Sequence, residues 1–307
     1  KSDEQTEKAI TLHQEVLKLV KDITGENHDF YAQALDNLGD DYCDQNDSDQ
    51  SMYYHLKAQE IRKETVGEKH IYYTTGLLRI GDSCLLMHKM EEAEEYFQQA
   101  LCLRKERYGE ENADYLEALM AIGGLRYEEN RLDEAQEIFE KALQIREKIF
   151  SHKDEEYAIN LKMLALISSQ RLEFDKAIQY SMDSLVAVEE AFGKDHPMTA
   201  KAYCNLGDIQ RGAGRYRDAM ESYQAACEKR IRLMGRDSVD YLISLSSLAQ
   251  VQYLCGKYES AADSCTFIDR MLEKEEFRHV LSFCGNCVLS ARVHEKLEDF
   301  YAVEKEY

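Results

Sequence analysis

The sequence predicts an all-α fold, an α-solenoid of antiparallel helix pairs, on the strength of two observations. The first is a set of glycines on a fixed 42-residue grid, at Gly25, Gly67, Gly109, Gly193 and Gly235. A constant period of this length is the signature of a repeat architecture. The second is the presence of a single proline in 307 residues. Because proline interrupts helices, its scarcity favours long helical segments.

Small residues mark three further positions of the repeat. Leu35, Leu38 and Gly39 are spaced as neighbours on one face of a helix, so Gly39 is expected to let a second helix approach closely. Each unit is therefore expected to be an A helix, a short turn and a B helix. The column of Gly39 continues through Gly81, Gly123, Ala165, Gly207, Ala249 and Ala291. Two columns on the B helix read Ser51, Ala93, Ala135, Ala177, Ala219, Ala261 and Ala58, Ala100, Ala142, Ser184, Ala226.

The period predicts the bounds of both helices in each copy. A helices are expected over 29–45, 71–87, 113–129, 155–171, 197–213, 239–255 and 281–297. B helices are expected over 49–65, 91–108, 133–150, 175–192, 217–234 and 259–274. The A–B turn carries Asn46, Asn130, Gly214 or Gly256, where the backbone reverses. The glycine grid then follows each B helix, where a left-handed residue ends a helix at the lowest steric cost.

These residues resemble the tetratricopeptide repeat family. The pattern Leu-x-x-Leu-Gly is followed by Ala twelve residues later and by a second Ala seven residues after that. The longer unit and the linker "GKDHP" at Gly193–Pro197 are similar to the kinesin-light-chain type of repeat. The resemblance implies one right-handed superhelical solenoid over 1–307. Its parts would be a half-repeat at 6–24, repeats at 29–66, 71–108, 113–150, 155–192, 197–234 and 239–274, and a partial repeat at 281–307.

Charge and cysteine content narrow the classes of partner and compartment. The chain has 38 Lys and Arg against 59 Asp and Glu, a formal charge of −21. Such a surface repels nucleic acid and anionic membranes. No apolar run approaches the ~18 residues of a membrane helix. Nine scattered cysteines do not form a disulfide framework and indicate a reducing, cytoplasmic setting. The chain starts without Met, so we expect it to be part of a larger protein.

Stacked helix pairs curve, and the A helices are expected to line the concave face. Asparagine amides there can both donate to and accept from an extended peptide backbone. For any single position, a solvated polar face is the alternative interpretation. The predicted peptide-binding or partner-binding residues are Asn37, Asp40, Arg79, Asp82, Tyr127, Lys162, Lys201, Asn205, Asp208, Arg211, Gln250 and Tyr253.

Two regions of opposite charge bear on the partner. Residues 201–236 hold eight basic residues against four acidic ones, whereas Asp40, Asp41, Asp44, Asp47 and Asp49 make the first repeat acidic. The basic island could bind an acidic motif, or it could pair with carboxylates of neighbouring repeats. The acidic end could take a basic ligand. We therefore expect a protein or peptide ligand that is basic or bipolar, and neither nucleic acid nor membrane insertion.

No enzyme, metal site or cofactor is predicted. The chain has no glycine-rich phosphate loop, and "GAG" at Gly212–Gly214 follows no strand. Cys284 and Cys287, with His279 and His294 nearby, could bind zinc or carry thiol chemistry. The period places Cys287 on the buried column of Leu35, so a core cysteine is the preferred interpretation.

The sequence thus predicts a scaffold or adaptor that binds a peptide segment or partner protein in the groove of the A helices. The resemblance to kinesin light chains implies a cargo or partner adaptor. Two alternatives stay open. The array could be a sensor or autoinhibitory region of a larger signalling protein, or a self-assembling structural scaffold.

Overall fold

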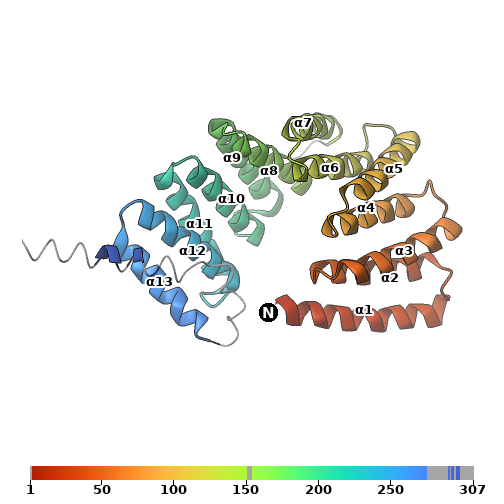
Figure 1. Cartoon of the computed structure of the whole chain (residues 1–307), viewed down its shortest axis with the longest axis horizontal. Coiled ribbons are helices and arrows are strands. Elements are labelled where there is room, and N and C mark those ends of the chain that lie inside the picture. The colour runs from red at the N-terminus through yellow and green to blue at the C-terminus, as the bar shows by residue number, and fades with distance from the viewer. Residues whose placement is uncertain (1, 151–153, 275–289, 291, 294, 298–307) are drawn as a thin grey trace, which may run out of the picture. The chain divides into compact units, whose positions relative to one another are not determined.

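The computed structural model describes residues 2–150, 154–274, 290, 292–293 and 295–297. It divides into two compact units, Lys1–Ser151 and His152–Tyr307, and each is described by itself (Figure 1). Every regular element in the described residues is an α-helix, and consecutive helices pack as pairs. The predicted all-α solenoid is confirmed.

The first unit runs from α1 to α7, and each helix packs against the next along the chain. Successive A helices also contact one another, α2 with α4 and α4 with α6, so they lie on the inner side of the stack. The helix predicted over 6–24 is α1, which begins earlier. The bounds are α1 (Ser2–Thr24), α2 (Asp29–Asp44), α3 (Ser48–Thr65), α4 (Ile71–Leu86), α5 (Met90–Tyr108), α6 (Ala113–Glu128) and α7 (Leu132–Ile149).

The second unit repeats this arrangement, and its A helices α8 and α10 contact each other. Its helices are α8 (Glu155–Gln170), α9 (Phe174–Phe192), α10 (Pro197–Gly212), α11 (Tyr216–Met234), α12 (Val239–Leu254) and α13 (Tyr258–Leu272). The predicted bounds of the A and B helices from residue 29 to residue 274 agree with the structure to within two residues. Cys284, Cys287 and most of the A helix predicted over 281–297 lie outside the described residues.

Each A helix begins at a capping side chain on the same 42-residue grid. Nδ1 of His28 accepts a hydrogen bond from the backbone N–H of Phe30, 3.1 Å away. His70, Asn112, Asp154, His196 and Ser238 cap the other A helices in the same way. The cap satisfies one of the backbone N–H groups that have no partner within the helix. This is the physical role of the histidine in the linker motif.

The glycine after a B helix has a positive φ, as predicted, but not the left-handed helical conformation. At Gly109, Gly193 and Gly235 φ lies between 79° and 88° and ψ between 166° and 179°. This extended region at positive φ is accessible almost only to glycine. The chain therefore leaves the B helix in an extended direction toward the cap of the next A helix.

The A–B turn places one residue in the left-handed region, with φ between 56° and 75°. Asn46, Asn130, Gly214 and Gly256 take this position as predicted, whereas His88 and Leu172 take it in the other two repeats. A branched side chain at this φ is strained, because its Cβ crowds the backbone. Leu172 gains little in return, since 72% of its surface is exposed.

Replacing Leu172 by glycine is expected to raise the free energy of unfolding by about 0.5–1 kcal/mol. The change removes about 1–2 kcal/mol of backbone strain from the folded state. Glycine also raises the conformational entropy of the unfolded chain, which offsets part of this gain. Urea denaturation followed by circular dichroism measures the difference. The control is Leu254→Gly at the end of α12, a leucine that is 48% exposed and helical. It should lose about 1 kcal/mol. Equal losses in both variants would contradict the strain at Leu172.

The small residue of each A helix makes room for a side chain of its own B helix. A Cβ added at Gly81 would lie 2.3 Å from the ring of Phe97, and one added at Gly207 would lie 2.8 Å from the ring of Tyr223. Where alanine replaces this glycine, the facing side chain is small instead: Ser181 stands across from Ala165, and Cys265 packs with Ala249. A bulky ring of the B helix therefore accompanies glycine on the A helix, and a small side chain accompanies alanine.

Candidate functional site

The predicted site residues of the first unit gather along the inner side of α2 and α4. Nε of Arg79 lies 3.3 Å from Oδ1 of Asp40, and a second guanidinium nitrogen lies 2.8 Å from Oδ2 of Asp36. Asn37 accepts a hydrogen bond from Gln33 at 3.0 Å. Arg79 is therefore largely committed to carboxylates of its own unit. Tyr127, on α6, is half-buried.

A buried polar network lies directly beneath these residues. The fully buried Asp36 accepts hydrogen bonds from His55, at 3.2 Å, from Arg62 and from Arg79. Burial alone would raise the pKa of Asp36, but the His55 hydrogen bond and the two arginine charges outweigh it and hold the pKa below its ordinary value. Since these partners come from α2, α3 and α4, the network fixes one repeat to the next.

Asp82 stands one turn from Arg79 on α4 and faces Asp40, Glu117, Arg79 and His55. The surrounding protein desolvates its carboxyl group, and the carboxylates of Asp40 and Glu117 add repulsion, so its pKa rises to about 6. Burial likewise raises the pKa of Asp40. Despite its exposed position, Asp82 thus carries a charge that its neighbourhood disfavours.

Asp82 makes stability depend on pH in a defined direction. A carboxyl group whose pKa is higher in the folded state than in the unfolded state binds more protons when folded. Its contribution therefore favours folding at low pH and is lost as pH rises from about 4 to about 6. Asp82→Asn should raise the free energy of unfolding at pH 7 by about 1 kcal/mol, after the full shift is reduced for solvent screening. Carboxyl NMR titration checks the pKa, and a value near 4 would contradict it.

In the second unit, Lys162, Lys201 and Asn205 surround a groove between α8 and α10. Two adjoining cavities of about 200 and 170 Å³ share Lys162 and Asn205 in their walls. Ala158, Val188 and Ala202 supply an apolar wall to the larger cavity, and Asp208 lines the smaller one. Within the described residues, the side chains of Lys162, Lys201 and Asn205 have no hydrogen-bond or ion-pair partner. This groove therefore offers three unused polar groups beside an apolar wall.

The charge of Lys162 is disfavoured by its surroundings. Desolvation, with the nearby charge of Lys201 adding to it, lowers the pKa of Lys162. Glu155 also lines the larger cavity, but among the described contacts it forms no ion pair with either lysine. An anion between the two ammonium groups would relieve this repulsion.

The remaining predicted residues of the second unit form a polar ladder from α10 to α12. Arg211 lies 3.3 Å from Asp208 and donates a hydrogen bond to Oε1 of Gln250, also at 3.3 Å. The hydroxyl of Tyr223 donates to Asp208 at 2.6 Å. Tyr253 packs its ring 5.5 Å from that of Tyr258. These side chains hold neighbouring A helices together and are less available than the lysine pair.

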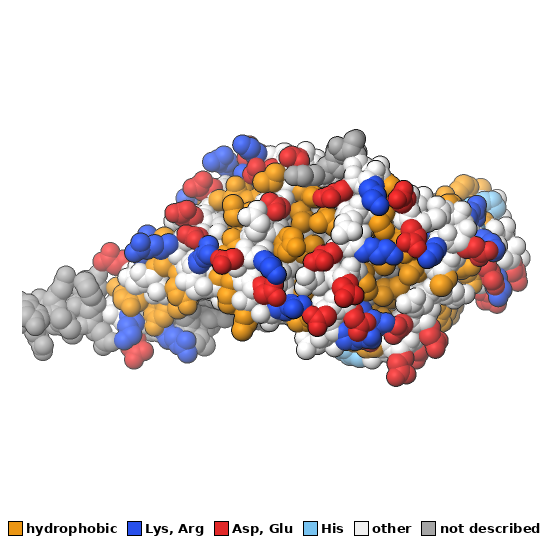
Figure 2. Space-filling view, turned by 90° about the horizontal axis from the view of Figure 1, so that it is seen from above, with side chains coloured by type: hydrophobic (Ala, Val, Ile, Leu, Met, Phe, Trp, Pro, Cys, Tyr) orange, Lys and Arg blue, Asp and Glu red, His pale blue; other side chains and the backbone are white. Residues whose placement is uncertain are grey.

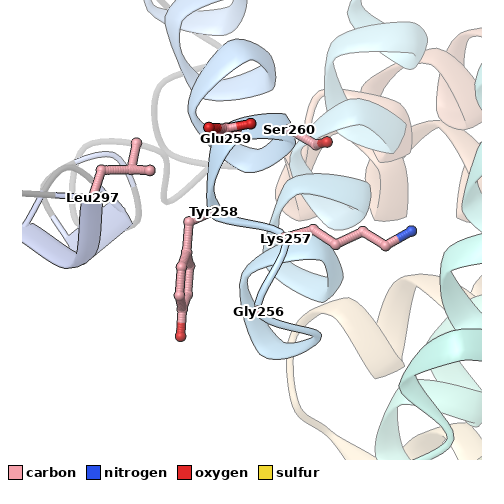
Figure 3. A pocket seen from close by; sticks show the side chains of 6 residues that line it. All are labelled: Gly256, Lys257, Tyr258, Glu259, Ser260 and Leu297. Carbon is pink, nitrogen blue, oxygen red and sulfur yellow. The ribbon is translucent and has the colours of Figure 1, made fainter. Parts of the chain in front are cut away.

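A third cavity, of about 330 Å³, lies between Leu297 and the first turn of α13 (Figure 3). Tyr258 stands beside the opening, while Lys257 points away from Leu297 (Figure 3). None of the twelve predicted site residues lines it. Acidic and basic side chains are interspersed over the face of the molecule seen in Figure 2.

Part of the basic island of residues 201–236 is paired with neighbours. Arg215 pairs with Asp175, Arg211 pairs with Asp208, and the buried Arg230 donates to the backbone carbonyl of Asp240 and to Ser244. Pairing between repeats therefore describes part of the island: Arg215, Arg230 and Arg232 have carboxylate partners in neighbouring repeats. Lys201 is its member that faces the groove.

The cysteines within the described residues are free thiols. Burial raises the pKa of Cys84 and Cys265 to about 11 and that of Cys227 to about 12. Such thiols are poor nucleophiles at neutral pH. In the described part of the chain, no cluster of His, Cys, Asp and Glu could hold a metal ion, and no helix is suited to crossing a membrane.

Sequence reasoning missed a column of buried arginines with the same period. Arg104 donates to Thr74, at 2.9 Å, and to the backbone carbonyl of Asp114, at 2.7 Å, so it ties α5 to the A helices on both sides. Arg62 and Arg230 occupy the same position in their repeats. The 42-residue spacing of these arginines was the signal that could have revealed them.

A tetratricopeptide repeat profile matches residues 2–64, 72–148, 115–185 and 155–231. The chain belongs to the tetratricopeptide repeat family. This confirms the resemblance seen in the sequence, and the matches span most of the chain. No curated protein matches it significantly.

Solved structures show the same fold at low sequence identity. The TPR-like repeats of a kinesin light chain from Podosopora anserina superpose with a TM-score of 0.60 at 14% identity, over 66% of this chain and 96% of that one. BtubC (BKLC) from P. vanneervenii gives 0.62 at 19%, over 73% and 88%. A chain of the APC/C hetero-tetramer Cut9–Hcn1 gives 0.59 at 12%, over 92% and 46%. These similarities show a TPR solenoid fold, and repeats of a kinesin light chain are among the structures that share it.

Proposed function

We propose that this TPR chain is a non-catalytic, cytoplasmic adaptor whose second unit binds an acidic peptide segment of a partner protein in the groove between α8 and α10. TPR repeats are in general protein-interaction scaffolds, and the groove supplies a specific place for a ligand. One observation carries the proposal. Lys162, Lys201 and Asn205 line adjoining cavities without a partner among the described residues.

The chemistry of the groove favours an extended anionic segment. A carboxylate between the two lysines would form charge-assisted hydrogen bonds, which are stronger than neutral ones. The Asn205 amide can donate to one peptide carbonyl and accept from one peptide N–H. The wall of Ala158, Val188 and Ala202 suits a small apolar side chain next to the acidic one.

The first unit offers the opposite charge. Asp40 and Asp82 lie along its inner side with raised pKa values, so a cationic side chain that approached them would relieve their repulsion. We propose that this edge accepts basic residues, which makes a ligand with both signs of charge the best match to the whole chain. The sensor and self-assembly alternatives have no observation of their own in their favour.

The test is a binding titration with a short fluorescein-labelled peptide in which glutamates alternate with leucine and alanine. The wild-type chain should bind it, and Lys162→Ala with Lys201→Ala should weaken binding by about tenfold or more. A control with Lys194→Ala and Lys257→Ala makes the same charge change at two exposed sites of the second unit and should retain binding. If the two double variants bound the peptide with equal affinity, the groove between α8 and α10 would not be its binding site.

A further inference from the structure

The groove of the second unit also holds a carboxylate that the rest of the described chain does not use. Glu155, in the first turn of α8, lines the same cavity as Lys162, Lys201 and Asn205. Its side chain is exposed and has no hydrogen-bond or ion-pair partner within the described residues. Among those residues, the cavity thus presents one anionic and two cationic side chains that are all unpaired.

The spacing along α8 explains why Glu155 and Lys162 do not pair with each other. They are seven positions apart, which is two helical turns, so they lie on the same side of α8 about 10.5 Å apart along its axis. Ion pairs within a helix form between residues three or four positions apart. The wall of the groove therefore holds two opposite charges at a separation that a ligand can bridge.

Apolar side chains occupy the wall between these two charges. Ala158 and Ile159 lie between the two charged residues of α8, and Ala202 of α10 lines the same cavity. Ser184 of α9 also lies in this wall, but its hydroxyl already donates to the backbone carbonyl of Ala158 at 2.8 Å. The part of a ligand that crosses this wall is therefore expected to be apolar and small.

The separation of the two charges favours one extended backbone conformation of the ligand. In polyproline II, residues i and i+3 point to the same side and lie about 9.3 Å apart. In a β-strand, side chains on one side are about 6.7 Å apart at i+2 and about 13 Å apart at i+4. The polyproline II repeat comes closest to the separation of Glu155 and Lys162 along α8, which is about 10.5 Å.

We propose that the groove between α8 and α10 selects a segment with an acidic and a basic residue three positions apart and small apolar residues between them. The acidic residue lies between Lys162 and Lys201, and Glu155 binds the basic one. This inference rests on the proposed binding of an acidic segment to the two lysines. It adds a second charge to the ligand and makes Glu155 the residue that sets the spacing.

The test has to separate this role of Glu155 from a local one. An acidic side chain in the first turn of a helix interacts favourably with the helix dipole. Glu156 lies in the same turn and is exposed, but it is not one of the residues that line the cavity. Glu156→Gln is therefore the matched control for Glu155→Gln, because it makes the same change in charge at the same end of α8.

The probes are short, fluorescein-labelled alanine peptides with one glutamate and one lysine. The two charged residues are placed two, three or four positions apart, in both chain orders, and each reference peptide has glutamine in place of lysine. All are titrated with the full chain. In the tighter-binding order, spacing three should bind about threefold more tightly than its reference, the gain expected of one exposed ion pair. Glu155→Gln should abolish this gain, Glu156→Gln should retain it, and high salt should diminish it.

Three results would overturn the proposal: equal affinity for all spacings, tightest binding at spacing two or four, and an undiminished gain in Glu155→Gln. The reference peptides distinguish this failure from that of the proposed function. If they bind and lysine adds nothing, the acidic site stands and the role of Glu155 is wrong. If neither they nor the lysine peptides bind, the groove is not a site for acidic segments, and both proposals fail.

Discussion

Asp36→Ala is expected to lower the free energy of unfolding by about 3–5 kcal/mol, because it removes the central acceptor of a buried network that includes the guanidinium of Arg62. Asp36 is fully buried, Arg62 is 1% exposed, and His55 is 2% exposed. Without the carboxylate, Arg62 keeps only its 3.4 Å contacts with Asp29 and Gln33, and His55 keeps only Asp40 at 3.6 Å. Urea denaturation followed by circular dichroism measures the loss.

The matched control is Asp44→Ala, an exposed aspartate on the same helix, which should change stability by no more than about 0.5 kcal/mol. The pH dependence supplies a second check. The folded-state pKa of Asp36 lies below its ordinary value, so its stabilising contribution is present above about pH 4 and is lost as pH falls through the folded pKa. The gap between wild type and Asp36→Ala should therefore narrow in acid. A gap that is constant down to pH 2 would contradict the network.

Phe97→Ala is expected to cost about 3–5 kcal/mol, since it removes a fully buried ring from the core of the first unit. Gly81→Ala, on the facing helix, is expected to cost about 1–3 kcal/mol, because the added methyl group would overlap that ring. Both losses are measured by urea denaturation. They arise at one contact, so they should not be additive.

The pair Gly81→Ala with Phe97→Ser recreates the Ala165 and Ser181 pair found in another repeat of the same chain. This double variant should be more stable than the sum of the losses of Gly81→Ala and Phe97→Ser, each measured alone, predicts. Gly124→Ala serves as the control, because nothing lies within 4 Å of an added Cβ there. It should gain about 0.5–1 kcal/mol from its helical position. If the losses in free energy of unfolding at positions 81 and 97 were fully additive, the size of one residue would not constrain the size of the other.

The helices could be predicted because their signals recur. Each A helix has its capping residue, small residue and apolar pair on the 42-residue grid. Several periodic residues therefore indicate where each A helix lies. His88 and Leu172 were not recognised as turn residues, because neither prefers positive φ. The period alone marks those positions, and tertiary packing of the two helices imposes the conformation.

The buried network could not be predicted, because its central residue has no periodic counterpart. Asp36 shares its repeat position with Leu78, Met120, Lys162, Cys204 and Ser246. A column that changes from acid to apolar to base gives no pattern to follow. The side chain at this position therefore differs in charge between repeats. It is the buried Asp36 in the first repeat and Lys162, which lines the groove, in the fourth.

The predicted site residues also differ in how available they are. Arg79 and Arg211 were chosen for their place on the A helix, which the structure confirms, but their guanidinium groups contact neighbours in their own unit. Sequence position gives the face of the helix and not the partners of a long side chain. Lys162, Lys201 and Asn205 line the cavities of the groove and have no hydrogen-bond or ion-pair partner among the described residues.

The most direct test of the adaptor account is a methyl NMR titration of the chain, labelled at alanine, with the glutamate-rich peptide. Ala158 and Ala202 line the proposed groove, whereas Ala32 and Ala118 are buried in the first unit. We predict saturable shifts at Ala158 and Ala202 that disappear in the Lys162→Ala, Lys201→Ala variant. Shifts confined to the first unit, or unchanged in that variant, would contradict binding of an acidic segment between α8 and α10.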